Sequence, residues 1–136
     1  ARKDAQKLVD AFWSRNWSVQ KVSEDINTRQ FFDSMWLQNP VSKFWYSLRS
    51  EKDRFSTLNQ GTGVFCFDSW VRICRDNGVK TVGQFHDEVI AIVKKGEEHN
   101  TKSTMEKAIV KLNYNLKLNV PLGVDAQFGQ TYADIH

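Results

Sequence analysis

The stretch VKTVGQFHDEVIAIV, residues 79–93, is the most informative segment of this chain. Two apolar runs, 79–85 and 89–93, stand on either side of the polar tripeptide His-Asp-Glu at 86–88. Short runs rich in β-branched and aromatic residues around a few polar ones are typical of a β-hairpin. We therefore expect two strands joined by a turn that presents one imidazole and two carboxylates.

Apolar spacing and turn residues predict the elements on either side of this hairpin. Before it we expect a helix over 2–32 in two pieces, with Asn16 as the cap of the second piece, and an aromatic hairpin or strand-like excursion over 34–48 around Asn39-Pro40. A long helix follows, opened by Ser50 and ended by Asn77-Gly78. After the hairpin we expect a helix over 101–118 and a third strand over 122–126. This order predicts an α+β fold, with helices packed on a small antiparallel sheet that contains the 79–93 hairpin.

Two glycines lie inside the expected long helix, in the segment Gln60-Gly61-Thr62-Gly63. Glycine lowers helix stability, so its presence there predicts a close backbone approach or a kink.

Composition limits the class of protein. The chain has 136 residues, 40% hydrophobic and 26% charged, which suits one compact domain and excludes a disordered tail. We expect no membrane association, because no run of apolar residues is long enough to span a bilayer and no signal segment opens the chain. The first residue is not Met, so we expect a piece of a longer protein.

Charge and cysteine content give weaker guidance. The formal net charge is +3, and residues 1–60 hold ten Lys and Arg against seven Asp and Glu, which is compatible with a phosphate-bearing partner or with ordinary solvated surface. Cys66 and Cys74 are eight residues apart in an expected helix, about 12 Å along its axis, which exceeds disulfide reach. A reducing, cytoplasmic compartment is therefore the expectation.

The turn at 86–88 offers two readings. It is an ordinary solvated hairpin turn, or it is a metal site, since neighbouring carboxylates repel unless a cation neutralises them and Mg²⁺ takes one or two carboxylates together with substrate phosphates.

The His86-Asp87-Glu88 turn resembles motif C of the family A DNA polymerases, the group that includes bacterial DNA polymerase I and several bacteriophage replicases. Other segments are similar to the family in the same order along nearly the whole chain, least so over 30–50. They are 1–15 (like the helix that follows the nucleotide-binding helix of the fingers), 60–62 (Gln-Gly-Thr), 120–125 (VPLGVD, like the final strand) and the ending from Tyr132 to His136.

The resemblance implies roles for the turn residues. Asp87 matches the aspartate that binds the catalytic metals, expected to be two Mg²⁺ ions. Glu88 matches its acidic neighbour, a lesser contributor, and His86 matches the residue near the 3′-terminal nucleotide of the primer.

It also implies a DNA-binding set. Gln60 matches a glutamine that contacts the minor groove of the template–primer duplex, and Gln84 stands at the position of another minor-groove neighbour. Glutamine donors there can check pair geometry without reading sequence, because purine N3 and pyrimidine O2 accept at every pair. Ser56 stands where the family usually has Asn, and Lys52 where a basic residue or His is common. Arg54 shares the phosphate or groove role, or is a surface arginine.

Two parts of a family A active site are missing from these residues: the second metal-binding aspartate of motif A and the fingers helix for the incoming nucleotide. Residues 1–136 are therefore expected to be the C-terminal palm and fingers-proximal segment of a bacteriophage-type polymerase, acting on primer–template DNA and deoxynucleoside triphosphates in a bacterial or infected host cytoplasm. A remaining segment or separate chain must supply the rest. The alternative is a non-catalytic DNA-binding or replisome scaffold module derived from a polymerase; a metal-dependent nuclease is weaker, because only two acidic residues converge.

Overall fold

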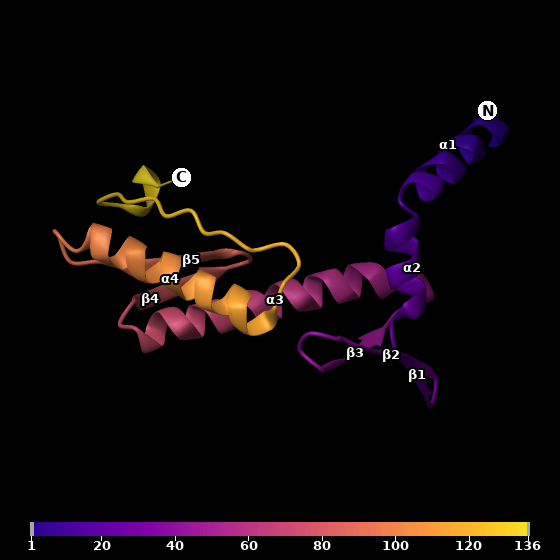
Figure 1. Cartoon of the computed structure of the whole chain (residues 1–136), viewed down its shortest axis with the longest axis horizontal. Helices are drawn as coiled ribbons and strands as arrows, with labels where there is room; N and C mark the ends of the chain where they lie inside the picture. Colours follow the sequence, from indigo (N-terminus) through magenta and orange to yellow (C-terminus); the bar gives the residue numbers. More distant parts are fainter. Residues whose placement is uncertain (1, 136) are drawn as a thin grey trace. The chain divides into compact units, whose positions relative to one another are not determined.

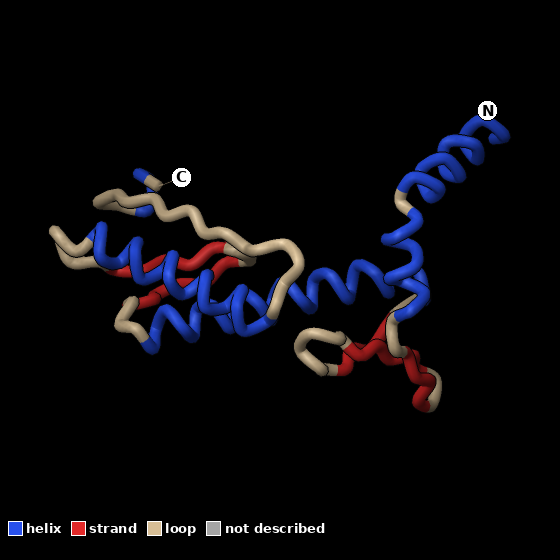
Figure 2. Tube along the Cα trace, viewed as in Figure 1, coloured by secondary structure: helices blue, strands red, loops and turns tan. Residues whose placement is uncertain are grey.

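A computed structural model describes residues 2–135, and the resemblances that reach Ala1 and His136 lie in part outside these residues. The chain forms two compact units, Ala1–Thr62 and Gly63–His136, which are described separately below. Within the described residues the fold is α+β, with four α-helices and two small antiparallel sheets (Figures 1 and 2). The expected fold class is confirmed at this level.

Unit 1 begins with helix α1 (Arg2–Arg15) and helix α2 (Trp17–Asp25). The expected break into two helical pieces is confirmed, and Asn16 stands at the expected N-cap position of α2, but its side chain makes no capping hydrogen bond there. Its side chain donates instead to the backbone oxygen of Phe12 at 2.8 Å and so closes the end of α1. The expected helix over 2–32 is also wrong at its end, because α2 stops at Asp25.

A three-stranded antiparallel sheet follows, in the order β1 (Thr28–Phe31), β2 (Ser34–Gln38) and β3 (Trp45–Leu48). Strand β1 takes residues that the local pattern assigned to helix. The β2–β3 hairpin confirms the expected strand-like excursion over 34–48. One face of this sheet packs with Leu58 into a small apolar core, which contains Leu37, Leu48, Ile26, Met35 and Tyr46.

The loop between β2 and β3 is held by Asn39, whose side chain is fully buried. Its Nδ2 donates to Thr62 Oγ1 at 2.8 Å and to the Leu58 oxygen at 3.3 Å. Its Oδ1 accepts from the backbone N–H groups of Val41 at 2.9 Å and Ser42 at 3.0 Å. The Asn39 amide thus satisfies two backbone N–H groups of the turn and links the turn to the following helix.

That helix, α3, spans Arg54–Asp76 and follows a 3₁₀ turn, η1 (Glu51–Asp53), where the Ser50 hydroxyl accepts from the Lys52 N–H. The expected start near Ser50 and end at Asn77-Gly78 are confirmed, and Gly78 has the left-handed φ of 89° common after a helix. The expected close approach is confirmed at Gly61, where a Cβ would lie 2.9 Å from Cζ of the Tyr46 ring; at Gly63 there is open space.

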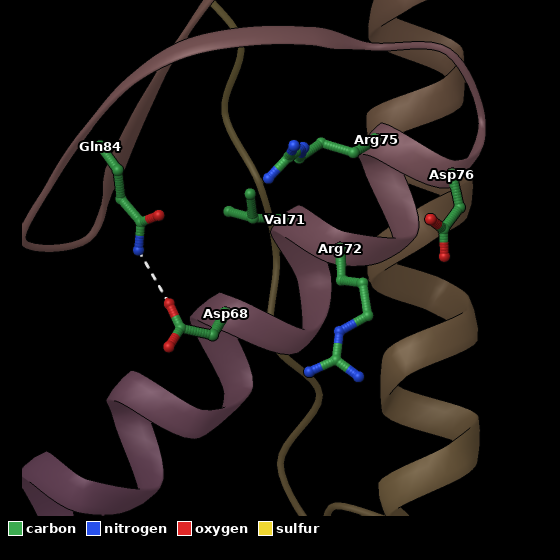
Figure 3. A pocket seen from close by; sticks show the side chains of 6 residues that line it. All are labelled: Asp68, Val71, Arg72, Arg75, Asp76 and Gln84. Atoms are coloured by element: carbon green, nitrogen blue, oxygen red, sulfur yellow. Dashed lines mark hydrogen bonds between the residues drawn. The ribbon is translucent and has the colours of Figure 1, made fainter.

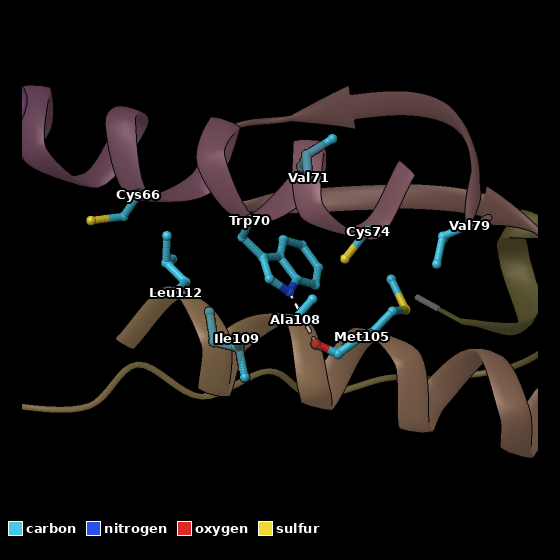
Figure 4. Close-up of a cluster of buried hydrophobic side chains, with 9 residues drawn as sticks. All are labelled: Cys66, Trp70, Val71, Cys74, Val79, Met105, Ala108, Ile109 and Leu112. Carbon is cyan, nitrogen blue, oxygen red and sulfur yellow. Dashed lines mark hydrogen bonds between the residues drawn. The ribbon is translucent and has the colours of Figure 1, made fainter. Parts of the chain in front are cut away.

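Unit 2 packs the second part of α3 against helix α4 (Glu98–Leu116) and the antiparallel hairpin of β4 (Lys80–Phe85) and β5 (Glu88–Ile92). Figure 4 shows the buried cluster, in which Trp70 Nε1 donates to the Met105 oxygen at 3.1 Å. Val89 and Ala91 of β5 pack against this cluster. The expected hairpin over 79–93, backed by helices, is confirmed.

The two cysteines are free thiols on α3 and both belong to the buried cluster of unit 2. Burial raises the pKa of the Cys66 thiol above its ordinary value and raises the pKa of Cys74 to about 11. Neither side chain is therefore an activated nucleophile.

The expected third strand over 122–126 is wrong: the described backbone has no strand there. Asn113 of α4 takes the place of a strand partner. Its Oδ1 accepts from the Leu122 N–H at 2.9 Å, and its Nδ2 donates to the Leu122 oxygen at 2.8 Å. Val124 packs on the core of unit 2 without joining a sheet.

None of the helices in residues 2–135 has both the length and the apolar character needed to cross a membrane.

Candidate functional site: the β4–β5 turn and its neighbours

The turn of the β4–β5 hairpin is as short as a hairpin turn ordinarily is. Phe85 pairs with Glu88, so only His86 and Asp87 lie between the paired positions. Two-residue turns favour a left-handed first residue, because that twist matches the twist of the strands. His86 has this conformation, with φ of 47°, although glycine or asparagine would adopt it at lower cost. The turn thus presents the imidazole and the carboxylate from two adjacent residues.

The two turn side chains face solvent. His86 and Asp87 are exposed, whereas Glu88 is half-buried. Within residues 2–135, Asp87 makes no hydrogen bond and no ion pair with another side chain. A carboxylate without a protein partner keeps all its lone pairs for water, a cation or a ligand.

The residues at this turn fit part of a magnesium site. Mg²⁺ is usually held by one or two carboxylates, with water and substrate phosphates completing the octahedron. Asp87, with Glu88 next to it, offers that donor chemistry. The described residues contain no group of three or more His, Cys, Asp or Glu side chains able to hold a metal ion.

Gln84, two residues before the turn, has a partner that the sequence did not predict. Its Nε2 donates to Oδ1 of Asp68 on α3 at 2.8 Å (Figure 3). This bond fixes which end of the amide faces the helix. One N–H of Gln84 is used, and its carbonyl oxygen and second N–H remain for a ligand.

The same two residues line a pocket of about 450 Å³ between α3 and β4. Arg72 and Arg75 contribute the positive charge of its wall, as Figure 3 shows; the lining is Asp68, Val71, Arg72, Arg75, Asp76 and Gln84. Sequence reasoning missed Asp68 and both arginines. Asp68, Arg72 and Arg75 are four and three residues apart, so they lie on one face of α3. This spacing could have grouped the three residues, but it does not predict that Gln84 lies beside them.

The remaining candidates lie in unit 1. Ser56 and Gln60 are four residues apart on α3 and therefore lie on one helical face, whereas Lys52 precedes them in the 3₁₀ turn η1; all three are exposed. The Ser56 hydroxyl donates to the Asp53 oxygen at 3.1 Å, which leaves its lone pairs for a ligand. Gln60 keeps a free amide within the described residues.

Arg54 is engaged inside unit 1. Its Nη2 lies 3.3 Å from Oε1 of Glu51 and 3.7 Å from the Met35 sulfur, and its side chain is 22% exposed. Its Nε is buried without a hydrogen-bond partner among the described residues. These contacts hold the guanidinium within unit 1, so a direct phosphate contact would require it to leave Glu51 and Met35.

The structure brings together four of the expected residues: Gln84, His86, Asp87 and Glu88 lie within five consecutive positions of one hairpin in unit 2. Comparison of the chain with protein-family models, with curated proteins and with solved structures finds no match in any of the three.

Proposed function

We propose that this chain is the C-terminal palm and fingers-proximal part of a family A DNA polymerase, which adds deoxynucleotides to a primer 3′-OH under the direction of a template. The observation that carries the proposal is the Asp87 carboxylate. It is exposed and unpartnered within the described residues, at the tip of a two-residue turn whose second strand, β5, packs on the core of unit 2.

Asp87 would hold Mg²⁺ jointly with an aspartate from a remaining polymerase segment or a separate chain, with Glu88 as a secondary ligand. The chemistry supplied by bound Mg²⁺ would be a lower pKa of the primer 3′-OH and partial neutralisation of the triphosphate charge. The contribution of this chain is the fixed position of the carboxylate, since a two-residue turn leaves it little freedom relative to β4 and β5.

Gln84 and His86 would position the primer terminus. Asp68 accepts one N–H of Gln84, so the amide presents its other N–H and its oxygen in a set orientation to a base-pair edge. The duplex would be contacted by Ser56 and Gln60 on α3 and by Lys52 just before it. The incoming deoxynucleoside triphosphate would be bound by the missing fingers helix. We place this activity in the cytoplasm of a bacterium or of a phage-infected host.

The test is primer extension with Mg²⁺, using the 136-residue chain mixed with a polymerase segment that carries motif A and the fingers. Asp87→Ala should lower the extension rate by about 10³-fold or more, because the metal loses a direct ligand. Glu106→Ala, which removes an exposed carboxylate from α4 in the same unit, is the matched control and should extend normally. DNA binding should be unchanged in both variants.

Extension retained by a clean Asp87→Ala preparation would refute the metal assignment. DNA binding without extension, with every partner segment tried, would favour a scaffold module derived from a polymerase. DNA degradation by the chain alone would favour a nuclease.

A further inference from the structure

The outer face of the β1–β2–β3 sheet carries aromatic side chains that no core of unit 1 uses. Strand alternation puts Leu37 and Leu48 on the inner face, packed with Leu58. The opposite face therefore carries Phe31 from β1, Trp36 from β2 and Trp45 from β3. Phe31 is 64% exposed and Trp45 36%, whereas Trp36 is half-buried and its Nε1 is shielded from solvent without a hydrogen-bond partner among the described residues.

Basic charge accompanies these rings. Arg29, on the same face as Trp36, reaches across β2 and places its guanidinium carbon 5.1 Å from the centre of the Trp45 ring. Across residues 28–50 there are three basic side chains, Arg29, Lys43 and Arg49, against one acidic side chain, Asp33. All four are exposed. The segment that contains the sheet thus carries aromatic side chains together with a net charge of +2, and strand pairing places Arg29 among these charges on the outer face.

We infer that this outer face, formed by Arg29, Phe31, Trp36 and Trp45, is a binding platform for single-stranded DNA. Unpaired bases stack on exposed aromatic rings whatever their sequence, and arginine and lysine beside the rings meet the phosphates. Sheets with exposed aromatic residues bind two or three bases in this way in other nucleic-acid-binding folds. An apolar protein partner would match the rings but not the charge excess. The choice of DNA over RNA rests on the proposed function; the platform uses none of the residues assigned to the primer terminus.

The platform is tested by fluorescence anisotropy with the whole 136-residue chain and a labelled oligothymidylate of about 12 nucleotides, within the usual site size of such surfaces. Phe31→Thr and Trp45→Thr keep β-propensity while removing the rings. Each should weaken binding by about 30-fold, the middle of the range for loss of one stacked base. Tyr114→Thr removes an 83%-exposed ring from α4 and is the matched control, expected to bind normally.

Charge is tested on the same probe. The slope of log affinity against log salt should be about −2 for three phosphate contacts, and Arg29→Gln should reduce its magnitude by about 0.7. Ser47→Lys and Ser47→Glu change the exposed position that pairs with Trp36 without removing any ring. The first should tighten binding and the second weaken it, so this pair decides the question even if the threonine variants fail to fold.

Equal affinity of the ring variants and the parent chain, or no difference between the two Ser47 variants, would overturn the platform. So would loss of binding to a polymerase segment with unchanged oligothymidylate affinity, which would identify a protein interface. Tighter binding of oligouridylate than of oligothymidylate would overturn the choice of DNA. Asp87→Ala should bind the oligonucleotide normally, so failure here and failure of the proposed polymerase activity are seen separately.

Discussion

Replacement of Asn39 by alanine should destabilise unit 1 more than its small change in volume suggests. The amide makes four hydrogen bonds from a fully buried position. The Leu58 oxygen keeps a second donor, the Thr62 hydroxyl at 2.8 Å, so the 3.3 Å bond to it contributes little. Three bonds remain, to Thr62, Val41 and Ser42. At about 1 kcal/mol each, their loss gives a decrease of about 3 kcal/mol in the free energy of unfolding.

The assay is urea unfolding of the 136-residue chain followed by far-UV circular dichroism, with the two units observed separately. Both cysteines lie in unit 2, so the rate at which they react with a thiol reagent reports that unit alone. Asn39→Ala should shift the transition of unit 1 and leave thiol protection close to that of the parent chain. Asn59→Ala is the matched control, because it removes the same amide from an exposed position on α3 and should be neutral or slightly stabilising.

A loss below about 1 kcal/mol for Asn39→Ala, with the sheet intact, would refute the reasoning. It would mean that water replaces the amide at the turn and that the turn does not depend on buried hydrogen bonds.

Two further predictions concern α3. Gly61→Ala should lower the midpoint of thermal unfolding, because the new Cβ would lie 2.9 Å from the Tyr46 ring and such overpacking costs about 1–3 kcal/mol. Gly63→Ala meets open space and should raise the midpoint, since alanine gains about 0.5–1 kcal/mol of helix stability over glycine. Midpoint shifts of the same sign in the two variants would contradict this prediction. Cys74 has a pKa of about 11 in the folded chain against 9.0 unfolded, so above pH 9 the unfolded state releases its proton first and stability falls as pH rises through this interval. Urea unfolding midpoints measured between pH 9 and pH 11 should fall less steeply with pH for Cys74→Ala than for the parent chain. An equal slope of midpoint against pH in the variant and the parent chain would count against thiol burial as the cause.

The elements set by local pattern were predictable. The 79–93 hairpin has apolar strands and a polar turn within fifteen residues, and α3 has a start at Ser50 and a stop at Gly78. Their signals are short-range, so the sequence contains them. The same holds for the turn residues His86 and Asp87, whose neighbours in space are also neighbours in sequence.

The errors came where distant partners decide. Residues 28–31 have a polar pattern that suits a helix, and only pairing with β2 makes them a strand. Residues 122–126 alternate like a strand but find Asn113 in place of a strand partner. The bond between Gln84 and Asp68 joins residues sixteen positions apart, and no periodicity in the sequence reveals it. Long-range pairing is the part of the fold that local propensity does not determine.

The left-handed backbone at His86 lowers the stability of the hairpin at a residue to which we assign a function. A glycine there would relieve about 1 kcal/mol of steric strain, so a search for tougher variants of this chain should select His86→Gly at the hairpin tip. The stabilised His86→Gly hairpin would then lack the imidazole that we assign to the primer end. Evolution toward heat resistance and evolution toward faithful copying would pull this single position in opposite directions.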